Sequence, residues 1–315
     1  MGNPPDAAVL REERRVLLAA TGEDRASFLH GMLTNDVAGL AAGGGVAALL
    51  LTEQGRITAS LTVLAEDERL LLDLDAEAAA RLEPALAKFI VADDIEFEKV
   101  EAHGVALFGA DARDALATIA EGELPAAEGA HGGLTVAGCP VLVVAVPRTE
   151  AAVLRVFAET AGDAETIVAA LETAGCASLD AAAAEDRRIR EGLAREGVDY
   201  DGGTLAPEVP SLASAVSFRK GCYLGQEVVE RVAARGKVNW LVQGLELEAP
   251  VAVGSELHHD GKAVGQVSSV SSGERAVAAI ARLRREIVEN ESAVEVAGAS
   301  GPVRGTVASV AAAEE

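Results

Sequence analysis

Lys220-Gly221-Cys222-Tyr223-Leu224-Gly225-Gln226-Glu227, hereafter the signature, is the stretch of this chain that decides its fold. Its thiol follows two cations, Arg219 and Lys220, and a helix is expected to begin at Gly225. Cations and the N–H groups of a helix start both favour a thiolate over a thiol. We therefore expect Cys222 to be a reactive cysteine. The alternative is that it packs as a small buried hydrophobe, which is the commonest fate of a free cysteine.

The charge balance inverts around the signature. The whole chain carries a net charge of −23, from 50 acidic and 27 basic residues. Between residues 219 and 237 the cations outnumber the acids, with Arg219, Lys220, Arg231, Arg235 and Lys237 against Glu227 and Glu230. Such a local excess predicts a pocket for an anion. The alternative interpretation is a solvated helix face on which Glu227 and Arg231 form an i,i+4 pair.

The hydrophobic pattern before the signature predicts an α+β fold. Apolar runs and helical spacings alternate in a β-α-β-β-α-β order twice, which is typical of ferredoxin-like halves. We expect a body over residues 1–235, with one half over about 1–100 and the other over about 101–235, and interleaving of the two stays open. Helices are predicted over residues 25–33, 75–89, 112–120, 149–160 and 164–174.

The pattern changes after Arg235-Gly236, where glycine would close the preceding helix. Asp260-Gly261 is a strong signal for a two-residue hairpin. Strands are predicted over residues 238–248, 256–258, 263–270, 276–283, 293–296 and 303–310. So many short strands in one segment imply a small Greek-key β-barrel over residues 236–315.

Composition argues against several classes of protein. A strongly acidic chain should repel nucleic acid and anionic membranes, and its acidity suits either high internal salt or a GC-rich genome. Three cysteines without a CxxC motif argue against a disulfide framework or a zinc site, so reduced cytoplasmic thiols are expected. Cys139 and Cys176 lie in apolar or Ala/Gly surroundings and are assigned to packing. No metal site is expected, because neighbours such as His258 and His259 point to opposite faces of a strand.

The signature resembles the K-G-C-Y-x-G-Q-E motif of the YgfZ family. Those are folate-binding proteins related to the aminomethyltransferase (T-protein) of the glycine cleavage system and to mitochondrial iron–sulfur assembly factors. Two other stretches are similar to elements of that family. Phe28-Leu29-His30-Gly31-Met32-Leu33-Thr34-Asn35-Asp36-Val37 resembles F-L-x-G-x-L/V-T-x-D-V, and Leu50-Leu51-Thr52-Glu53-Gln54-Gly55-Arg56-Ile57 resembles L-x-x-x-G-R/K-I. Pro207-Glu208 precedes the signature as in the family.

This resemblance implies a fold, a ligand and a set of site residues. The fold would be T-protein-like, with two ferredoxin-like α+β parts and a C-terminal Greek-key β-barrel arranged as a ring around a central folate pocket. The ligand would be tetrahydrofolate or a derivative. The function would be support of iron–sulfur enzyme assembly or repair and, indirectly, of tRNA modification, with iron–sulfur enzymes or assembly proteins as partners. Cys222 and Lys220 would be catalytic. Folate would be held by Asn35, Asp36, Glu208, Tyr223, Gln226, Glu227, Arg231 and Arg235.

Two departures from the family pattern keep other functions open. The T-protein carries G-G-x-x-D-D-L in its hairpin strand, with a catalytic aspartate, whereas Ala59 and Ser60 stand at those positions here and cannot act as a general base. Aminomethyl transfer is therefore disfavoured and would need another acid or base, such as Glu208 or Asp94. Arg190 replaces the pterin-anchoring glutamate of an R-I-E-A-G element. That leaves a third alternative, a module that kept the fold and lost the ligand, unless Glu208 substitutes.

Overall fold

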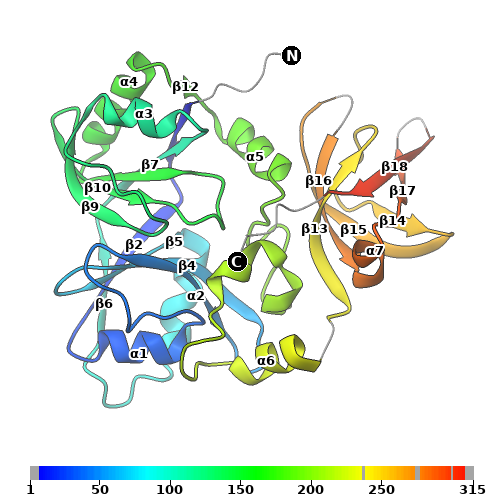
Figure 1. Ribbon diagram of the computed structural model, residues 1–315, viewed down its shortest axis with the longest axis horizontal. Helices are drawn as coiled ribbons and strands as arrows, with labels where there is room; N and C mark the ends of the chain where they lie inside the picture. Colours follow the sequence, from blue (N-terminus) through cyan, green and yellow to red (C-terminus); the bar gives the residue numbers. More distant parts are fainter. Residues whose placement is uncertain (1–6, 236–237, 274–276, 299–300, 309–315) are drawn as a thin grey trace. The chain divides into compact units, whose positions relative to one another are not determined.

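The computed structural model of the chain describes residues 7–235, 238–273, 277–298 and 301–308 (Figure 1). The chain forms two compact units whose segments alternate along the sequence. Unit 1 comprises Met1–Leu50, Thr58–Ala181 and Arg219–Leu224, and unit 2 comprises Leu51–Ile57, Ala182–Phe218 and Gly225–Glu315. The signature is thus divided, with its first five residues in unit 1 and its last three in unit 2.

A five-stranded sheet forms the first half of unit 1, in the order β3-β4-β5-β2-β6. Its strands are β2 Arg15–Thr21, β3 Gly45–Leu51, β4 Ile57–Ala65, β5 Leu70–Asp75 and β6 Glu96–Val100. Successive side chains of a strand point to opposite faces. Leu18 and Leu72 accordingly join one core with helices α1 (Arg25–Met32) and α2 (Ala76–Leu86), whereas Leu17 and Leu71 face the second sheet of the unit.

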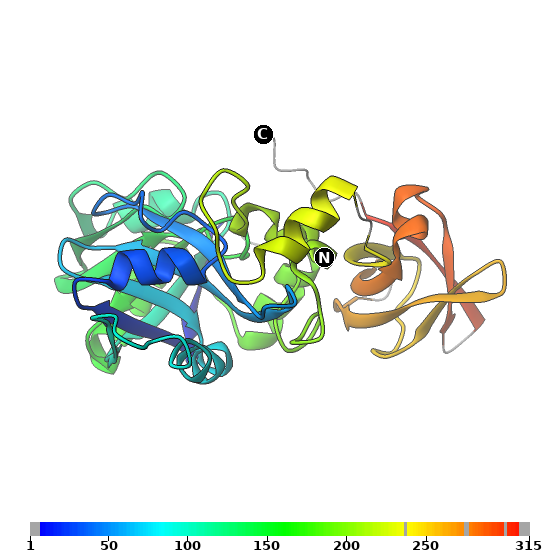
Figure 2. The same ribbon diagram turned by 90° about the horizontal axis from the view of Figure 1, so that it is seen from below.

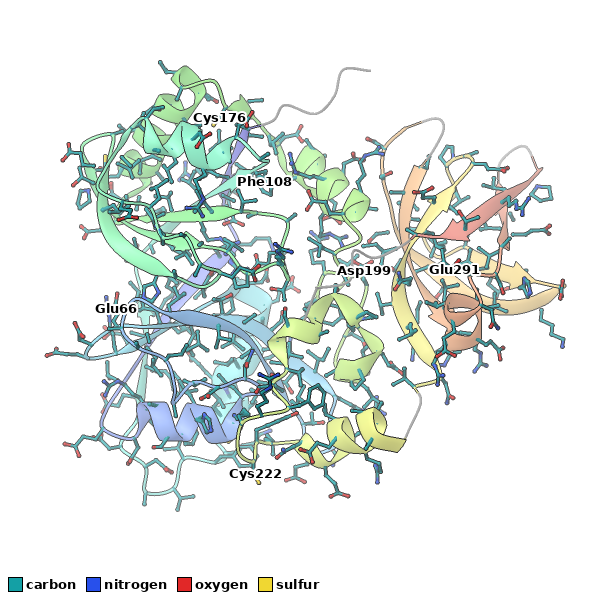
Figure 3. The ribbon with its side chains drawn as sticks, viewed as in Figure 1. Glu66, Phe108, Cys176, Asp199, Cys222 and Glu291 are labelled. Carbon is teal, nitrogen blue, oxygen red and sulfur yellow. The ribbon has the colours of Figure 1, made fainter. Side chains whose placement is uncertain are left out.

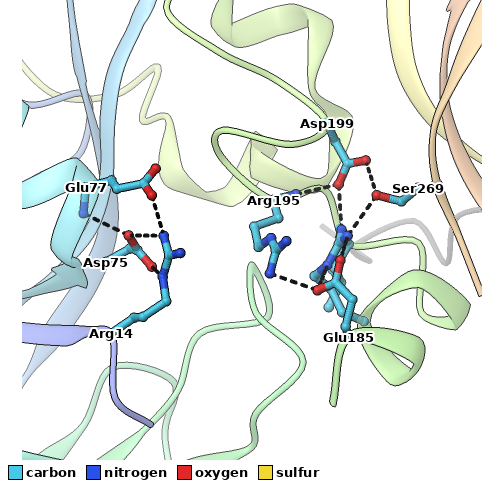
Figure 4. A network of polar contacts seen from close by, with 9 residues as sticks. Arg14, Asp75, Glu77, Glu185, Arg195, Asp199 and Ser269 are labelled. Atoms are coloured by element: carbon cyan, nitrogen blue, oxygen red, sulfur yellow. Dashed lines mark hydrogen bonds and ion pairs between the residues drawn. The ribbon is translucent and has the colours of Figure 1, made fainter. Parts of the chain in front are cut away.

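The start of α2 shows why the chain turns from strand to helix there. Asp75 ends β5, and its carboxylate accepts the Glu77 N–H at 2.9 Å, which satisfies one of the orphan donors of a helix start. Arg14 binds both carboxylates, at 3.1 Å from Asp75 and 2.9 Å from Glu77 (Figure 4). The helix predicted over 75–89 is therefore confirmed, with Asp75 as its cap.

A seven-stranded sheet forms the second half of unit 1, in the order β12-β1-β7-β11-β10-β9-β8. Its strands are β1 Ala8–Glu12, β7 His103–Phe108, β8 Ala120–Glu121, β9 His131–Val136, β10 Cys139–Ala145, β11 Leu154–Ala158 and β12 Ala177–Ser178. Helices α3 (Ala112–Ala117) and α4 (Ala161–Thr173) cover its outer face. Its inner face packs on the first sheet through side chains such as Val144 and Phe157. Strand β1 precedes β2 in sequence but pairs with β7, so the two halves interleave.

The helix predicted over residues 149–160 is wrong, because this segment contains strand β11. Its centre, Leu154–Ala158, is buried at every position. The strand lies between β7 and β10 and pairs antiparallel with both. A strand that pairs on both edges and is buried on both faces owes its conformation to tertiary packing, which overrides the local propensity of its residues.

Burial of β11 brings a charged side chain between the two sheets. Arg155 is 1% exposed, and its guanidinium donates to Glu12 at 2.5 Å, to Asp73 at 2.7 Å and to Glu150 at 2.7 Å. Arg15 binds Asp73 and Glu150 from the other side, at 2.7 and 3.1 Å. Asp73 is completely buried. The network joins β1, β5 and β11 and so ties the two sheets of unit 1 together.

Unit 2 contains a closed six-stranded barrel in the order β13-β16-β15-β14-β17-β18 (Figures 1 and 2). Its strands are β13 Trp240–Leu247, β14 Glu256–His259, β15 Lys262–Val270, β16 Val277–Arg284, β17 Val294–Gly298 and β18 Gly301–Val307. All six predicted strands are thus confirmed. The hairpin at Asp260-Gly261 is confirmed as well, with φ of 49° and 74°, the pair of positive values that a type I′ turn requires. The predicted boundary residue Gly236 lies outside the described residues.

Short helices precede and accompany the barrel. They are α5 Ala181–Arg190, the 3₁₀ turns η1 Ala206–Glu208 and η2 Pro210–Ala215, α6 Gln226–Arg235 and α7 Arg285–Glu289. Helix α6 begins one residue after Gly225, as the signature predicted. Among the described residues, no helix is long and apolar enough to cross a membrane.

A buried carboxylate in unit 2 joins the segment after α5 to the barrel. Asp199 accepts from Arg188 at 2.6 Å, from Ser268 at 2.5 Å and from Ser269 at 2.7 Å; Asp199 and Ser269 are seen in Figure 4. Two consecutive serines of a regular strand would face opposite ways. The register of β15 shifts between Val267 and Ser269, and this irregularity lets both hydroxyls reach one carboxylate.

Two glycines shape the approach of the Leu51–Ile57 segment to α6 within unit 2. Gly55 has φ of 73° and Gly225 has φ of 82°, values that favour glycine. A Cβ at Gly225 would overlap the carbonyl oxygen of Thr52, and a Cβ at Gly55 would lie 2.9 Å from the Cβ of Val228. The glycine of the hairpin motif and the second glycine of the signature are therefore required by the same close contact.

We expect Gly225→Ala to destabilise the protein more than Gly138→Ala. Gly138 has a similar φ of 80°, but a methyl group there would point into open space, so its replacement should cost only the backbone strain of about 1–2 kcal/mol. The clash at Gly225 should add about 1–3 kcal/mol. Urea unfolding of both variants measures the difference, and equal losses would contradict the close approach to Thr52.

Candidate functional site

The signature loop, residues Arg219–Leu224, lies on the C-terminal end of α1 within unit 1. The Lys220 ammonium donates to the carbonyl oxygens of His30, of Leu33 at 2.7 Å and of Asn35 at 3.2 Å. The last carbonyls of a helix have no partner within the helix, and a cation there also meets the negative end of the helix dipole. Because an ammonium has three donors, all of them are used by main-chain oxygens in this arrangement.

The environment of Lys220 changes its acidity. Burial of the ammonium lowers its pKa to about 8, and the nearby Asp36 carboxylate opposes this shift only in part. The nitrogen also lies 5.2 Å from the centre of the Tyr223 ring, a cation–π contact within one loop. Lys220 is therefore surrounded by carbonyls and an aromatic face.

The other end of the loop is anchored on the same helix. The Leu224 N–H donates to the Gly31 oxygen at 3.1 Å, and Tyr223 is 7% exposed. The Asn35 amide, which follows α1, donates to Ala47 at 2.8 Å and so fixes the turn that carries the carbonyls. The structure thus brings together two motifs that are far apart in the sequence, with a separation of 190 residues between His30 and Lys220.

Cys222 is exposed (Figure 3), whereas its neighbour in the sequence, Tyr223, is buried. This excludes the alternative in which Cys222 packs as a buried hydrophobe. Cys139 and Cys176 are buried in the core of the seven-stranded sheet, as predicted, and burial raises the pKa of both thiols. Cys222 is the accessible thiol of the described chain.

Titration of the native protein with a thiol reagent should therefore show one fast-reacting cysteine. Cys222→Ser should abolish the fast phase, and Cys176→Ala should leave it unchanged, because a buried thiol with a raised pKa supplies little thiolate. Unfolding in denaturant should release the remaining thiols. A fast phase that survives in Cys222→Ser would contradict this assignment.

A histidine that was not among the predicted site residues also lies beside the signature loop. His30 lies in the last turn of α1, and its Nδ1 accepts the Ala38 N–H at 3.2 Å and lies 3.3 Å from Asp36. Its Nε2 would lie 3.9 Å from a Cβ at Gly221, beside the cysteine of the signature. Burial and the charge of Lys220 lower the pKa of His30. Its place at the variable position of the F-L-x-G motif was the only available signal.

Three of the predicted ligand residues of α6 contact side chains along the same helix. Gln226 donates to Glu230 at 2.6 Å, and Arg231 lies 3.9 Å from Glu227. Glu227 and Arg231 are exposed, which agrees with the alternative of a solvated helix face. These residues belong to unit 2, whereas Asn35, Asp36, Lys220, Cys222 and Tyr223 belong to unit 1. The side chain of Arg235 and all of Lys237 lie outside the described part of the chain.

Glu208 is a buried acid of unit 2. Its side chain is 9% exposed and lies 3.4 Å from Arg282. Burial raises its pKa, although Arg282 and Arg56 oppose the shift. Asp94, the other acid considered from the sequence, instead accepts the Glu23 N–H at 3.0 Å and serves a turn.

Residues 188–192, which stand at the position of the R-I-E-A-G element, begin in the last turn of α5, and their two arginines have different partners. Arg188 is buried and binds Asp199. Arg190 binds Asp186 at 2.6 Å and the Ser272 carbonyl oxygen. Glu191 pairs with Arg187 at 3.0 Å. The Arg190 side chain therefore links α5 to the barrel.

A separate cavity of about 560 Å³ lies between the two sheets of unit 1. Its floor includes Leu17, Leu71 and Phe157, and four glutamates and Arg69 lie among its lining residues. None of the predicted site residues lines it. In the described part of the chain, no group of three or more His, Cys, Asp or Glu side chains is placed to hold a metal ion.

Comparison with known proteins gives a fold and a distant relative. No family model matches the sequence. "Putative transferase At1g60990, chloroplastic" from Arabidopsis thaliana is 26% identical over 267 residues, which cover 81% of this chain and 60% of that protein's length. A crystal structure of glycine cleavage system aminomethyltransferase T from Bartonella henselae has a TM-score of 0.83 at 19% identity and covers 98% of this chain and 86% of its own. The chain therefore has the fold of the glycine cleavage T-protein, with two α+β parts and a C-terminal barrel, as the sequence predicted.

Proposed function

We propose that this chain is a folate-binding protein of the YgfZ kind that supports the assembly or repair of iron–sulfur enzymes and, through them, tRNA modification. The observation that carries the proposal is the presentation of Cys222. Its thiol is exposed, while Lys220 on one side and Leu224 on the other are anchored to α1. A loop held in this way offers a thiol to a partner without burying it.

The hairpin strand supports a role other than aminomethyl transfer. Ala59, at one of the two aspartate positions of the T-protein, is fully buried in β4. Neither Ala59 nor Ser60 can accept a proton as a carboxylate would. The fold is therefore kept without the acid on which the T-protein reaction depends.

The buried acid Glu208 fits one end of a folate. The pterin ring carries N–H donors. The Glu208 carboxylate has Arg282 at 3.4 Å and a backbone hydrogen bond with Leu205, and its two oxygens can accept further hydrogen bonds. Arg282 and Arg56 lie near enough to Glu208 to act on its charge. We assign pterin recognition to Glu208, and tetrahydrofolate when bound would supply one-carbon chemistry.

Cys222 would act together with ligands from a partner. A thiolate is both a nucleophile and a metal ligand, but an iron–sulfur cluster usually takes about four such ligands. Among the residues that the structure describes, no group of three or more His, Cys, Asp or Glu side chains is placed to hold a metal ion. In this proposal an iron–sulfur enzyme or an assembly protein supplies the remaining ligands.

The test is the activity of a [4Fe–4S] enzyme in a strain that lacks this chain. We expect the activity to fall and a plasmid copy of the chain to restore it. An enzyme of the same strain without a cluster serves as control and should not change. An unchanged [4Fe–4S] activity in the deletion strain would overturn the proposal.

Folate-dependent aminomethyl transfer is the second candidate, favoured by the fold and by Glu208. Burial raises the pKa of Glu208, which favours the protonated carboxyl that a general acid needs. Purified protein with tetrahydrofolate and an aminomethyl donor should then release ammonia, and Glu208→Gln should stop the release while keeping the shape of the side chain. No release by the wild type would exclude this candidate.

A further inference from the structure

The signature lysine makes its contacts with the protein itself. Its nitrogen lies within hydrogen-bond distance of the carbonyl oxygens of His30, Leu33 and Asn35. These oxygens belong to the last turn of α1 and the segment that follows it, where helix carbonyls otherwise lack partners. One ammonium therefore closes the end of a helix that is remote in sequence.

We propose that Lys220 is a positioning residue, whose ammonium fixes the signature loop on the C-terminal end of α1 and thereby presents Cys222, in place of binding an anionic ligand. This inference rests on the proposed function only for the role of Cys222 as the working thiol. The contacts themselves lie entirely within unit 1.

Contacts on both sides of Cys222 support this role. Lys220 is anchored two residues before the thiol, Tyr223 is buried one residue after it, and the Leu224 N–H is bound to Gly31. Only Gly221 and Cys222 between these points are exposed. Loss of the Lys220 contacts would release the loop before Cys222, whereas the Leu224 contact would still hold it after Cys222.

Lysine suits this position better than arginine. An ammonium is compact and directs three donors in a tetrahedral arrangement, which matches three oxygens around one point. A guanidinium is planar and directs its donors outward as a fork, which suits carboxylates and phosphates. If the charge at this position served an anion, arginine would be an effective replacement; if it caps carbonyls, arginine would not.

Hydrogen exchange of the full chain, without folate or any partner protein, tests the proposal. Lys220→Ala should speed exchange in the peptides covering residues 26–36 and 219–225 at least tenfold, and exchange in β2 and β5 should stay as in the wild type. Lys220→Arg should behave like Lys220→Ala. Lys88→Ala, which removes an exposed lysine, is the matched control and should change neither peptide.

Addition of an amine then separates capping from simple loss of the side chain. The atoms that Lys220→Ala removes correspond to n-propylammonium, which should restore slow exchange in this variant and leave the wild type unchanged. Tetramethylammonium has the same charge but no N–H donor, and it should not restore it.

The opposite results would overturn the proposal. They are wild-type exchange in Lys220→Ala, restoration by Lys220→Arg, or equal rescue by tetramethylammonium. Protection of the wild-type loop by sulfate that is lost in Lys220→Ala would instead assign Lys220 to an anion. Lys220→Met keeps the apolar stem and replaces Lys220→Ala if the latter does not fold. Since no folate or cluster enters this experiment, its failure would leave the proposed function untouched.

Discussion

Arg155→Met is expected to lower the free energy of unfolding by about 3–5 kcal/mol, the cost of removing one partner from a buried group of charges. Arg155 is 1% exposed and Asp73 is completely buried, so the carboxylate cannot turn to water when the guanidinium is lost. Arg15 alone would then face Asp73, Glu12 and Glu150. Denaturant unfolding of the variant against the wild type measures this loss.

Two further variants show whether the loss comes from burial of charge. Arg148→Met removes an arginine whose side chain is 84% exposed and which pairs with Glu128, and it should change stability by no more than about 0.5 kcal/mol. Asp73→Asn combined with Arg155→Met removes both charges and should recover part of the loss. If the double variant is less stable than the sum of the single variants predicts, the interpretation as an uncompensated buried charge is wrong.

The same network predicts an acid limit of stability. Glu150 is half-buried, which alone would raise its pKa, but Arg15 and Arg155 lower the pKa to about 2, against a usual value of 4.5. A carboxylate with a lowered pKa contributes stability that is fully present above pH 4.5 and is lost as the pH falls towards 2. Glu150→Gln should therefore flatten the pH dependence of unfolding in that window, and an unchanged slope would contradict the pairing.

The strands and turns of this fold were largely predictable because they depend on local sequence patterns. The Asp260-Gly261 hairpin needs positive φ at both residues, and the sequence offers residues that tolerate it. The barrel strands alternate in the way that a barrel interior requires. The segment over residues 149–160 was not predictable, because its strand is determined by β7, β10 and the buried charges around Arg155.

The association of two distant motifs could be predicted from the sequence, but their contacts could not. The motif around Asn35 and the signature could be grouped by resemblance, and the structure places both the motif and the first five residues of the signature in unit 1. The hydrogen bonds from Lys220 to carbonyl oxygens could not be predicted. Every residue carries a main-chain oxygen, and the sequence does not show which of these oxygens will lie near the ammonium. The same holds for His30, whose partner Ala38 contributes only a backbone N–H.

Cys222→Ser is expected to abolish the function of this chain without unfolding it. The side chain is exposed and fills no core, so the substitution should change stability by no more than about 0.5 kcal/mol. A serine hydroxyl is neither a thiolate nucleophile nor a comparable soft metal ligand. Cys176→Ala, which removes a thiol from the core of the seven-stranded sheet, provides the control.

The most direct test measures [4Fe–4S] enzyme activity in the deletion strain carrying wild type, Cys222→Ser or Cys176→Ala at equal protein levels. We predict restored activity with the wild type and with Cys176→Ala, and the activity of the empty strain with Cys222→Ser. Full restoration by Cys222→Ser would contradict the central claim that this protein functions through the exposed thiol of the signature.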